Sequence, residues 1–292
     1  MQAVDQHISV ALRHYASQLE GHFRCDVIAY MGPIYPSTLT RYREVLEALK
    51  ASKLKPDGHQ AENLVIVLTT PGGVVETVEK MVSITRHHYS DVSFVIPDMA
   101  MSAGTVWCMS GDRIWMDYAS SLGPIDPQVQ SANGSLVPAL GYLDKVKELI
   151  EKSKANALTA AEVVMLKSID LAELRRYEQA KDLSISLLKQ WLVKFKFKNW
   201  AAHRTHNPGA PVTNEEKETR AQQIAEHLMN NNMWHSHSRM ISMEQLKSDL
   251  RLEVDDYTTV SELRDPVRIY NSLLAESLER QGSQVIVHSA RG

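Results

Sequence analysis

The middle of the chain alternates short, continuously apolar segments with helical patterns, and this alternation restricts the possible folds more than any other feature. The apolar segments are too short for helices and are rich in β-branched residues, as expected of buried strands. They comprise Leu64–Leu68, Val92–Ile96 and Arg113–Met116, with helical patterns between them at Val74–Tyr89 and 102–110. Buried strands that alternate with helices are typical of parallel sheets with right-handed crossovers. The sequence therefore predicts an α/β fold.

Further elements are expected on both sides of this block. Cys25–Met31 has the pattern of another buried strand, and loops are expected at Lys53–Glu62 and Trp200–Asn214. Apolar residues recur at helical spacing in residues 4–20, Thr38–Ala51, Tyr142–Lys154, Ala160–Phe195, Thr219–Asn230 and Ile241–Leu250. The residues after 282 show no clear pattern, and no internal repeat or linker divides the chain.

The composition excludes several classes of protein. The 292 residues include 32 Lys and Arg against 35 Asp and Glu, so no electrostatic attraction to nucleic acid or an anionic membrane is expected. The two cysteines, Cys25 and Cys108, are too few for a disulfide framework or a thiolate metal site. The N-terminus lacks the apolar segment of a signal peptide, and charged and turn-forming residues interrupt the most apolar stretch, Val92–Met109. We therefore expect a soluble, cytoplasmic protein with no membrane span and no bound metal.

Small residues follow two of the expected strands. Pro71-Gly72-Gly73 comes after the first and Met101-Ser102-Ala103-Gly104 after the second. Because the carboxyl ends of parallel strands share one edge of a sheet, both turns are expected to line the same crevice. Glycines leave backbone N–H groups open to an approaching group, and a serine at a helix N-terminus lies in a field that favours negative charge. These features suggest Ser102 as a nucleophile, with the N–H groups of Gly73 and Ala103 as an oxyanion hole.

Simpler interpretations of the same residues stay open at this point. Gly72 and Gly73 could form only a tight turn, and Ser102 could serve only as a helix cap. A phosphate site is a further alternative, because glycine-rich turns at helix starts bind anions. However, the patterns GxxxxGK[ST] and GxGxxG of nucleotide-binding loops are absent from this block.

A serine nucleophile needs a base, and the sequence offers several candidates. No histidine occurs between residues 115 and 154, whereas four lysines do. A desolvated lysine can be neutral and act as the base of a Ser-Lys dyad. Lys145 and Lys147 would point about 200° apart on a helix, both near the edge of its apolar side, so periodicity does not choose between them. His235 and His237, in a polar segment further along, are alternative bases.

Three motifs in a fixed order carry a family resemblance. They are Thr70-Pro71-Gly72-Gly73, Ala100-Met101-Ser102-Ala103-Gly104-Thr105 and Ser121-Leu122-Gly123-Pro124-Ile125-Asp126-Pro127-Gln128. In this order and spacing they resemble the Clp-protease/crotonase superfamily. More closely, the chain is similar to the serine dehydrogenase proteinase group of signal-peptide-peptidase-A-like serine peptidases. The resemblance covers residues 25–150.

The resemblance implies an architecture. The expected fold is Clp/crotonase-like: a parallel sheet with crossover helices, built from ββα-type repeats, together with a helical C-terminal extension. Residues 1–24 would form an N-terminal helix and residues 25–200 a serine peptidase core. Residues 201–292 would form a mainly helical extension packed on that core.

The resemblance also assigns roles near the two turns. It implies that Ser102 is the nucleophile and that the backbone at Gly72, Gly73 and Ala103 forms the oxyanion hole. Clp proteases place a catalytic histidine about two dozen positions after the serine, where this chain has Asp126, so a triad of that type is not expected. Asp126 could orient the base or shape the crevice, or it could only cap its own turn.

For the base, the resemblance favours a lysine. Members similar to signal peptide peptidase A use a lysine some forty positions after the nucleophile, and Lys145 stands 43 positions after Ser102 (145 − 102). Lys147 is the local alternative, and His235 and His237 remain accessory candidates.

The function implied is that of a serine endopeptidase that acts on peptide or protein substrates through an acyl-enzyme and needs no cofactor. Relatives of this kind assemble into rings or tetramers, which implies a homo-oligomer, with the amphipathic N-terminal helix as one candidate contact. Two alternatives differ in chemistry: a crotonase-like enzyme that polarises the thioester of an acyl-CoA, and a non-catalytic oligomeric scaffold. The sequence does not identify the cleavage specificity or an ATPase partner.

Overall fold

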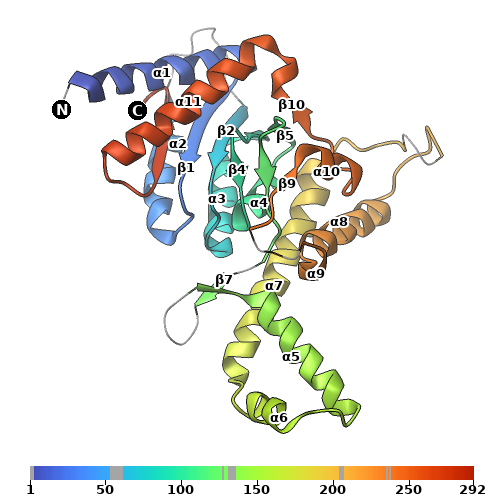
Figure 1. Cartoon of the computed structure of the whole chain (residues 1–292). Coiled ribbons are helices and arrows are strands. Elements are labelled where there is room, and N and C mark those ends of the chain that lie inside the picture. The colour runs from blue at the N-terminus through green and yellow to red at the C-terminus, as the bar shows by residue number, and fades with distance from the viewer. Residues whose placement is uncertain are drawn as a thin grey trace.

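Six strands form the main sheet of the computed structural model. The structure describes residues 3–52, 62–126, 128–130, 136–203, 207–234, 236 and 238–292. The strands are β1 (Asp26–Met31), β2 (Asn63–Thr69), β3 (Asp91–Val95), β5 (Arg113–Met116), β10 (Asp255–Asp256) and β11 (Ile286–Ser289). Their spatial order is β10-β5-β3-β2-β1-β11, and all neighbours are parallel except β1 and β11 (Figure 1). The predicted α/β fold with a mostly parallel sheet is confirmed.

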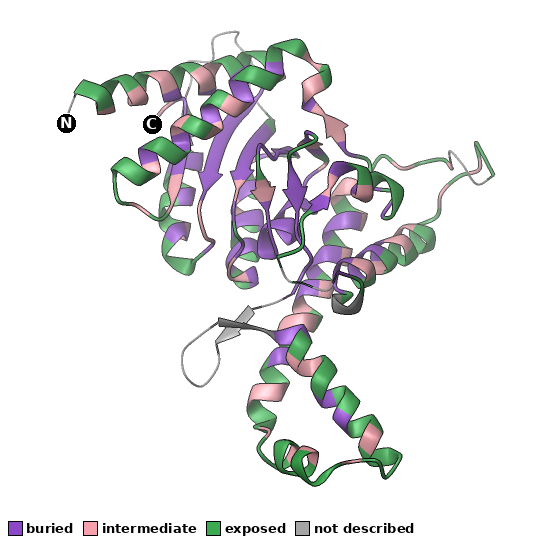
Figure 2. Ribbon diagram, in the orientation of Figure 1, coloured by how far each residue is buried: buried purple, intermediate pink, exposed green. Residues whose placement is uncertain are grey.

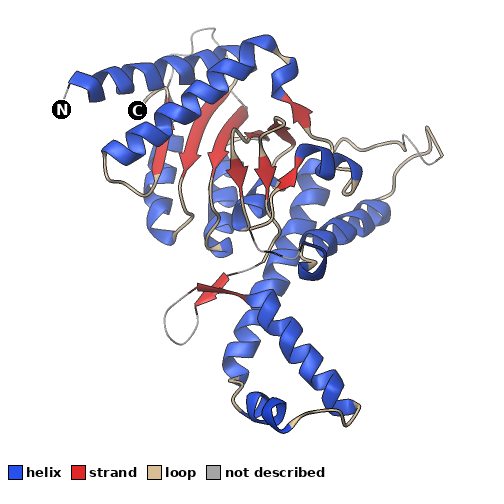
Figure 3. Cartoon of the chain, viewed as in Figure 1, coloured by secondary structure: helices blue, strands red, loops and turns tan. Residues whose placement is uncertain are grey.

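The main sheet is buried on both faces because alternate residues of each strand enter different cores. Val27 of β1 and Val65 of β2 face one core, whereas the next residues, Ile28 and Ile66, face the other. Helices α1 and α11 cover the first face, and α2, α3 and α4 cover the second, so helices lie on both sides of the strands (Figure 3). These helices are α1 (Ala3–Phe23), α2 (Leu39–Ala51), α3 (Val75–His88), α4 (Ala103–Cys108) and α11 (Ser261–Arg280).

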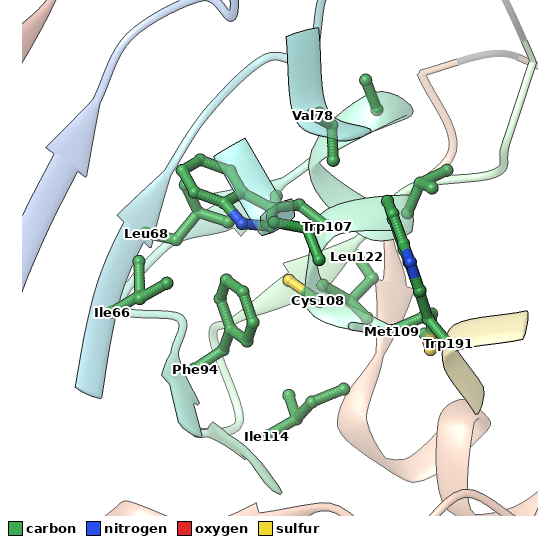
Figure 4. Close-up of a cluster of buried hydrophobic side chains, with 14 of the residues drawn as sticks. Ile66, Leu68, Val78, Phe94, Trp107, Cys108, Met109, Ile114, Leu122 and Trp191 are labelled. Atoms are coloured by element: carbon green, nitrogen blue, oxygen red, sulfur yellow. The ribbon is translucent and has the colours of Figure 1, made fainter. Parts of the chain in front are cut away.

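Trp107 lies at the centre of the larger core and anchors α4 (Figure 4). Its ring is fully buried and meets Tyr30, Tyr42 and Phe94 edge to face, with ring centroids 5.3, 5.6 and 5.9 Å away. Such aromatic pairs contribute about 0.5–1.5 kcal/mol each beyond the burial of their area. Because α4 begins at Ala103, this packing also fixes the turn immediately before the helix.

A smaller sheet and a hairpin extend the edge at which the main strands end. Strand β4 (Met99–Ala100) pairs in parallel with β6 (Ser121–Leu122), and β6 pairs antiparallel with β9 (Ile241–Ser242). An isolated parallel bridge between Thr70 and Ala100 joins the end of β2 to this smaller sheet. The hairpin consists of β7 (Gln128–Gln130) and β8 (Leu136–Pro138).

Helices α5 and α6 and the first half of α7 project away from the sheets (Figure 1). We call this projecting segment, residues 139–180, the arm. The arm is mostly exposed (Figure 2), and α6 has no buried residue. The second half of α7 returns to the core, where Leu187, Leu188 and Trp191 are buried. The elements concerned are α5 (Ala139–Lys154), α6 (Ala160–Lys167), α7 (Leu171–Trp191) and a π-helical turn at Leu192–Lys196. They are followed by α8 (Asn214–Leu228), α9 (Asn231–Trp234) and α10 (Met243–Ser248).

One expectation about a single element was wrong, and one region without a clear sequence pattern has a defined structure. The segment Ala160–Phe195 is not one helix, because Asp170 caps the start of α7 by accepting hydrogen bonds from the N–H groups of Ala172 and Glu173. The region after residue 282, which shows no clear pattern in the sequence, forms β11 at the edge of the main sheet. This strand is defined by its pairing with β1 rather than by its own four residues.

The expected loop Lys53–Glu62 lies outside the described residues except for its last position. Strands β10 and β11 both lie within the expected C-terminal extension, residues 201–292, yet both pair with strands of the main sheet. The division of the chain at residues 24 and 200 stays a prediction. Across the described ranges, no helix combines the length and the apolar character that crossing a membrane would require.

Candidate active site

The two turns of small residues lie against each other at the carboxyl edge of the main sheet. The N–H of Thr70 donates to the carbonyl of Met99 (2.9 Å), and the N–H of Met101 donates to the carbonyl of Thr70 (3.0 Å). A Cβ atom on Gly72 would lie 2.8 Å from the Met101 oxygen and 3.0 Å from the Ser102 Cβ, and Gly72 has a φ of +103°. Only glycine therefore permits this close approach. The structure thus brings together the two turns that the strand order predicts to share a crevice.

Ser102 lies at the N-cap position of α4 in a backbone conformation that is rare for a side-chain-bearing residue. Its φ and ψ are +50° and −114°, and it is 4% exposed. The hydroxyl makes no capping hydrogen bond to α4 and instead donates to the backbone carbonyl of Asp126 (3.3 Å). A strained serine between a strand and a helix is the geometry of a nucleophile elbow, which presents Oγ away from the backbone. The Ser102 hydroxyl therefore does not cap α4, and the backbone conformation resembles that of a nucleophile elbow.

Backbone donors flank Ser102. The N–H groups of Gly73 and Ala103 have no acceptor among the described residues, whereas the N–H of Gly72 donates to the Thr70 hydroxyl (3.0 Å). Backbone donors that are preorganised and unoccupied are what an oxyanion hole requires. The geometry thus favours Gly73 and Ala103 as the donors and gives Gly72 the role of allowing the turns to approach.

Hydrogen bonds to one residue hold the first turn in place. The N–H of Ile34 donates to the carbonyl of Gly72 (2.9 Å), and the N–H of Val74 donates to the carbonyl of Ile34 (2.9 Å). Gly73 has a φ of +151°, and a Cβ there would lie 2.2 Å from the Ile34 oxygen. No sequence motif points to Ile34, because its contact with the turn depends on how the chain between β1 and α2 is folded.

A pocket opens beside Ser102. Its cavity volume is about 60 Å³, and its walls come from the first turn, the start of α3, α4, the loop after β6, and α7. The lining residues are Gly73, Val74, Val75, Glu76, Ser102, Ala103, Val106, Ile125, Ala180 and Ser184. Two of them, Ala180 and Ser184, belong to α7 and have no sequence signal, because they meet Ser102 only through the folding of the arm.

Asp126 connects Ser102 with the arm. It is 3% exposed, its carbonyl accepts the Ser102 hydroxyl, and its Oδ1 accepts the N–H of Leu140 (3.0 Å) in the first turn of α5. A carboxylate is stabilised at a helix N-terminus by the unpaired N–H groups and the helix dipole. One residue thereby fixes both the serine rotamer and the start of the helix that carries the predicted lysines.

The predicted lysines lie on the exposed surface of α5. The Nζ of Lys145 is 3.0 and 2.9 Å from the carboxylate oxygens of Glu148, and the Lys145 side chain is 54% exposed. Hydrogen bonds from Lys145 and Lys152 lower the pKa of the Glu148 carboxyl. Lys147 is also exposed. Neither Lys145 nor Lys147 lines the pocket beside Ser102, so the role of each stays a prediction.

The remaining candidates add no further group to the site. His235 and His237 lie outside the described residues. Cys25 and Cys108 are free and buried; burial raises the pKa of Cys25 to about 12 and raises that of Cys108 as well, so neither thiol is activated. Within the described ranges, no group of three or more His, Cys, Asp or Glu side chains could hold a metal ion.

Comparison with known proteins gives a family match over most of the chain. A family model described as a ClpP-like SDH-type serine proteinase matches residues 17–209. The uncharacterized protein MJ1495 of Methanocaldococcus jannaschii is 28% identical over 160 residues, which are 54% of this chain and 51% of that protein. The uncharacterized protein MJ0137 of the same organism is 32% identical over 99 residues, or 33% of this chain and 32% of that protein. The chain thus aligns with about half or less of the length of these relatives.

Solved structures of similar shape include two mutants of the 1510-N membrane-bound stomatin-specific protease. A serine-to-alanine mutant aligns with a TM-score of 0.46 and 15% identity, covering 82% of each chain. A lysine-to-alanine mutant in complex with a substrate peptide aligns with a TM-score of 0.46 and 17% identity, covering 81% of this chain and 76% of that one.

Proposed function

The chain belongs to the ClpP-like SDH-type serine proteinase family, and on that premise we propose that it is a serine endopeptidase with Ser102 as its nucleophile. The family predicted from the three sequence motifs is thereby confirmed. The observation that carries the proposal is the conformation of Ser102, a strained and buried serine beside two unoccupied backbone N–H groups. A helix cap requires neither the strain nor the free donors.

In the proposed reaction, Ser102 Oγ attacks the carbonyl carbon of the scissile peptide bond while its proton passes to a base. The carbonyl oxygen gains negative charge and accepts hydrogen bonds from the N–H groups of Gly73 and Ala103. The C–N bond then breaks, the leaving amine takes the proton from the base, and an acyl-enzyme ester remains. Water attacks this ester, again with transfer of a proton to the base, and releases the acid product with Ser102 restored.

We assign the base to Lys145, with Lys147 as the alternative. The assignment rests on family resemblance and on the link from Asp126 to the first turn of α5. A lysine acts as a base only when neutral, so Lys145 must first separate from the Glu148 carboxylate. Because both residues belong to α5, a change of the Lys145 side-chain rotamer would achieve this separation.

The ion pair provides a test of this base. Glu148→Gln removes the carboxylate that holds Lys145, and we expect hydrolysis near neutral pH to rise about two- to five-fold, the range that a weak surface ion pair supports. Glu151→Gln, which breaks the equivalent pair with Lys154 on the same helix, is the matched control and should change nothing. Equal rates for the two variants would remove the argument for Lys145.

We further propose that the active form is a cytoplasmic homo-oligomer. The apolar face of α1, with Leu12, Ala16 and Leu19, is already covered by α11 and is unavailable to another subunit. At the tip of the arm, by contrast, Val164 is 67% exposed and Leu171 is 76% exposed. Apolar residues gathered on a projecting element favour contact with a partner. The free, buried cysteines suit a reducing compartment.

The peptidase reaction is tested with an unfolded protein substrate and mass spectrometry of the products. We expect new peptide termini with wild type and with the exposed control Ser186→Ala, and a loss of at least about 10³-fold with Ser102→Ala. Lys145→Ala should cause a similar loss, whereas Lys147→Ala should not. Cleavage that persists in Ser102→Ala would contradict the proposal, and a thermal shift with acyl-CoA in a protein that cleaves nothing would favour the crotonase-like alternative.

A further inference from the structure

The pocket beside Ser102 has one wall that comes from a distant part of the chain. Ala180 and Ser184 of α7 line the pocket together with Val74 and Val75, which follow the first turn directly in the chain. Positions 180 and 184 are one helical turn apart and therefore face the same way. The next position on that side, Leu188, is fully buried in the core. The pocket therefore exists at this place because α7 has small side chains where it passes the nucleophile.

Most of the lining residues carry apolar side chains. Among them, Val106 and Ile125 are 1% and 2% exposed. The Ser184 hydroxyl donates to the Ala180 carbonyl (3.0 Å), so its polarity is satisfied within α7. Glu76 is the one charged lining residue and is exposed in the first turn of α3. A polar group that packed against Val106, Ile125 and Ala180, away from the Gly73 and Ala103 N–H groups, would lose water without a side-chain partner there, which disfavours its binding.

We propose that Ala180 and Ser184 determine the specificity of the site by setting the size of the apolar side chain that it accepts on the acyl side of the scissile bond. This inference rests on the proposed function, because it takes Ser102 as the group that becomes acylated. The acyl group bound to Ser102 Oγ extends into the pocket, where its carbon atoms contact the α7 wall. Enlarging either α7 residue shortens the chain that fits and leaves the nucleophile and the oxyanion donors unchanged.

The experiment measures hydrolysis of p-nitrophenyl esters with acetyl, butyryl, hexanoyl and octanoyl chains. In each reaction the acyl carbon passes from the p-nitrophenolate oxygen to Ser102 Oγ, and the released p-nitrophenolate is followed by its absorbance. Each buried methylene is worth up to about a four-fold gain, so we expect wild type to prefer hexanoyl over acetyl esters by at least about ten-fold in kcat/KM. The preference should disappear in Ala180→Leu, because hexanoyl hydrolysis should fall at least about ten-fold more than acetyl hydrolysis does.

Matched variants separate an effect on the pocket from a general effect on α7. Gln179→Leu and Ser186→Val place the same side chains at exposed positions of the same helix and should keep the wild-type preference. Ser184→Val is the milder pocket variant and should reduce the preference at least about three-fold, which keeps the test valid if Ala180→Leu does not fold. Labelling of Ser102 by a small ethyl fluorophosphonate reports, for every variant, that the nucleophile is intact.

Two results would overturn the inference in different ways. If the pocket variants label normally and retain the wild-type chain-length preference, α7 does not determine specificity, although the proposed nucleophile stands. If wild type forms no adduct and the ester hydrolysis persists in Ser102→Ala, the proposed function fails and the inference with it.

Discussion

Replacing Ser102 by glycine should give a more stable protein than replacing it by alanine. Both variants remove the hydroxyl and its hydrogen bond to the Asp126 carbonyl, so they differ only in the backbone. At a φ of +50° and a ψ of −114°, alanine keeps the strain of the native serine, which for such conformations costs about 1–3 kcal/mol. Glycine has no Cβ and avoids this strain, although the greater flexibility of its unfolded chain reduces the gain in stability by about 0.5–1 kcal/mol.

The net difference in the free energy of unfolding should be up to about 2.5 kcal/mol, and about 1 kcal/mol at the middle of both ranges. For a chain of 292 residues, an unfolding entropy of about 2.1 cal/mol/K per residue converts this into a rise in Tm of roughly 2 °C, and of up to about 4 °C. Thermal and urea denaturation at matched protein concentration both measure it. Ala275→Gly, at an exposed position within α11, is the control and should destabilise by about 1 kcal/mol. A Ser102→Gly protein no more stable than Ser102→Ala would refute the idea that the serine is held in a strained conformation.

Three other predictions concern groups away from the nucleophile. Burial lowers the pKa of His288 to about 4, so the unfolded chain binds a proton at a higher pH than the folded chain does. The free energy of unfolding should therefore fall by about 3 kcal/mol between pH 6.5 and 4. His288→Gln should flatten this part of the pH dependence measured by urea denaturation. Burial also lowers the pKa of Lys196 to about 8, so the charged lysine destabilises the fold, and Lys196→Met should raise the free energy of unfolding by roughly 1–3 kcal/mol at pH 7. The difference between the variant and wild type should shrink as the pH rises from 8 to 10.5, and a constant difference would contradict this. Val164→Glu at the arm tip should reduce the oligomer mass measured by light scattering, whereas Val10→Glu on α1, where Val10 is 59% exposed, should not. Equal masses for the two variants would exclude the arm tip as the contact between subunits.

The parts of the fold that sequence patterns predict are those specified by neighbouring residues. Leu64–Leu68 and Val92–Ile96 are buried strands because β-branched runs of this length fit a two-sided sheet, and the turns after them follow from their glycines. Since parallel strands end at a common edge, the meeting of the Gly72 and Ser102 turns also follows from local patterns.

The parts that were missed depend on contacts between distant segments. Helix α11 contains Pro266, which on its own favours the end of a helix. The helix continues through this residue because its apolar side packs against α1 and the main sheet. The α7 wall of the pocket gives no signal, because Ala180 and Ser184 are ordinary small residues until the arm places them beside Ser102. Helical periodicity does not separate Lys145 from Lys147 for a related reason: the position of an exposed side chain on α5 relative to the pocket depends on how the arm is placed.

The most direct test of the account is to react the wild-type protein with a fluorophosphonate and identify the modified residue by intact mass and peptide mapping across pH 6–10. We expect a single adduct on Ser102, absent from Ser102→Ala and formed much more slowly in Lys145→Ala. Loss of the adduct in Ser102→Ala alone would retain the nucleophile and move the base to Lys147 or to the segment with His235 and His237. Absence of any adduct on the wild-type protein in its native assembly would contradict the assignment of Ser102 as a nucleophile.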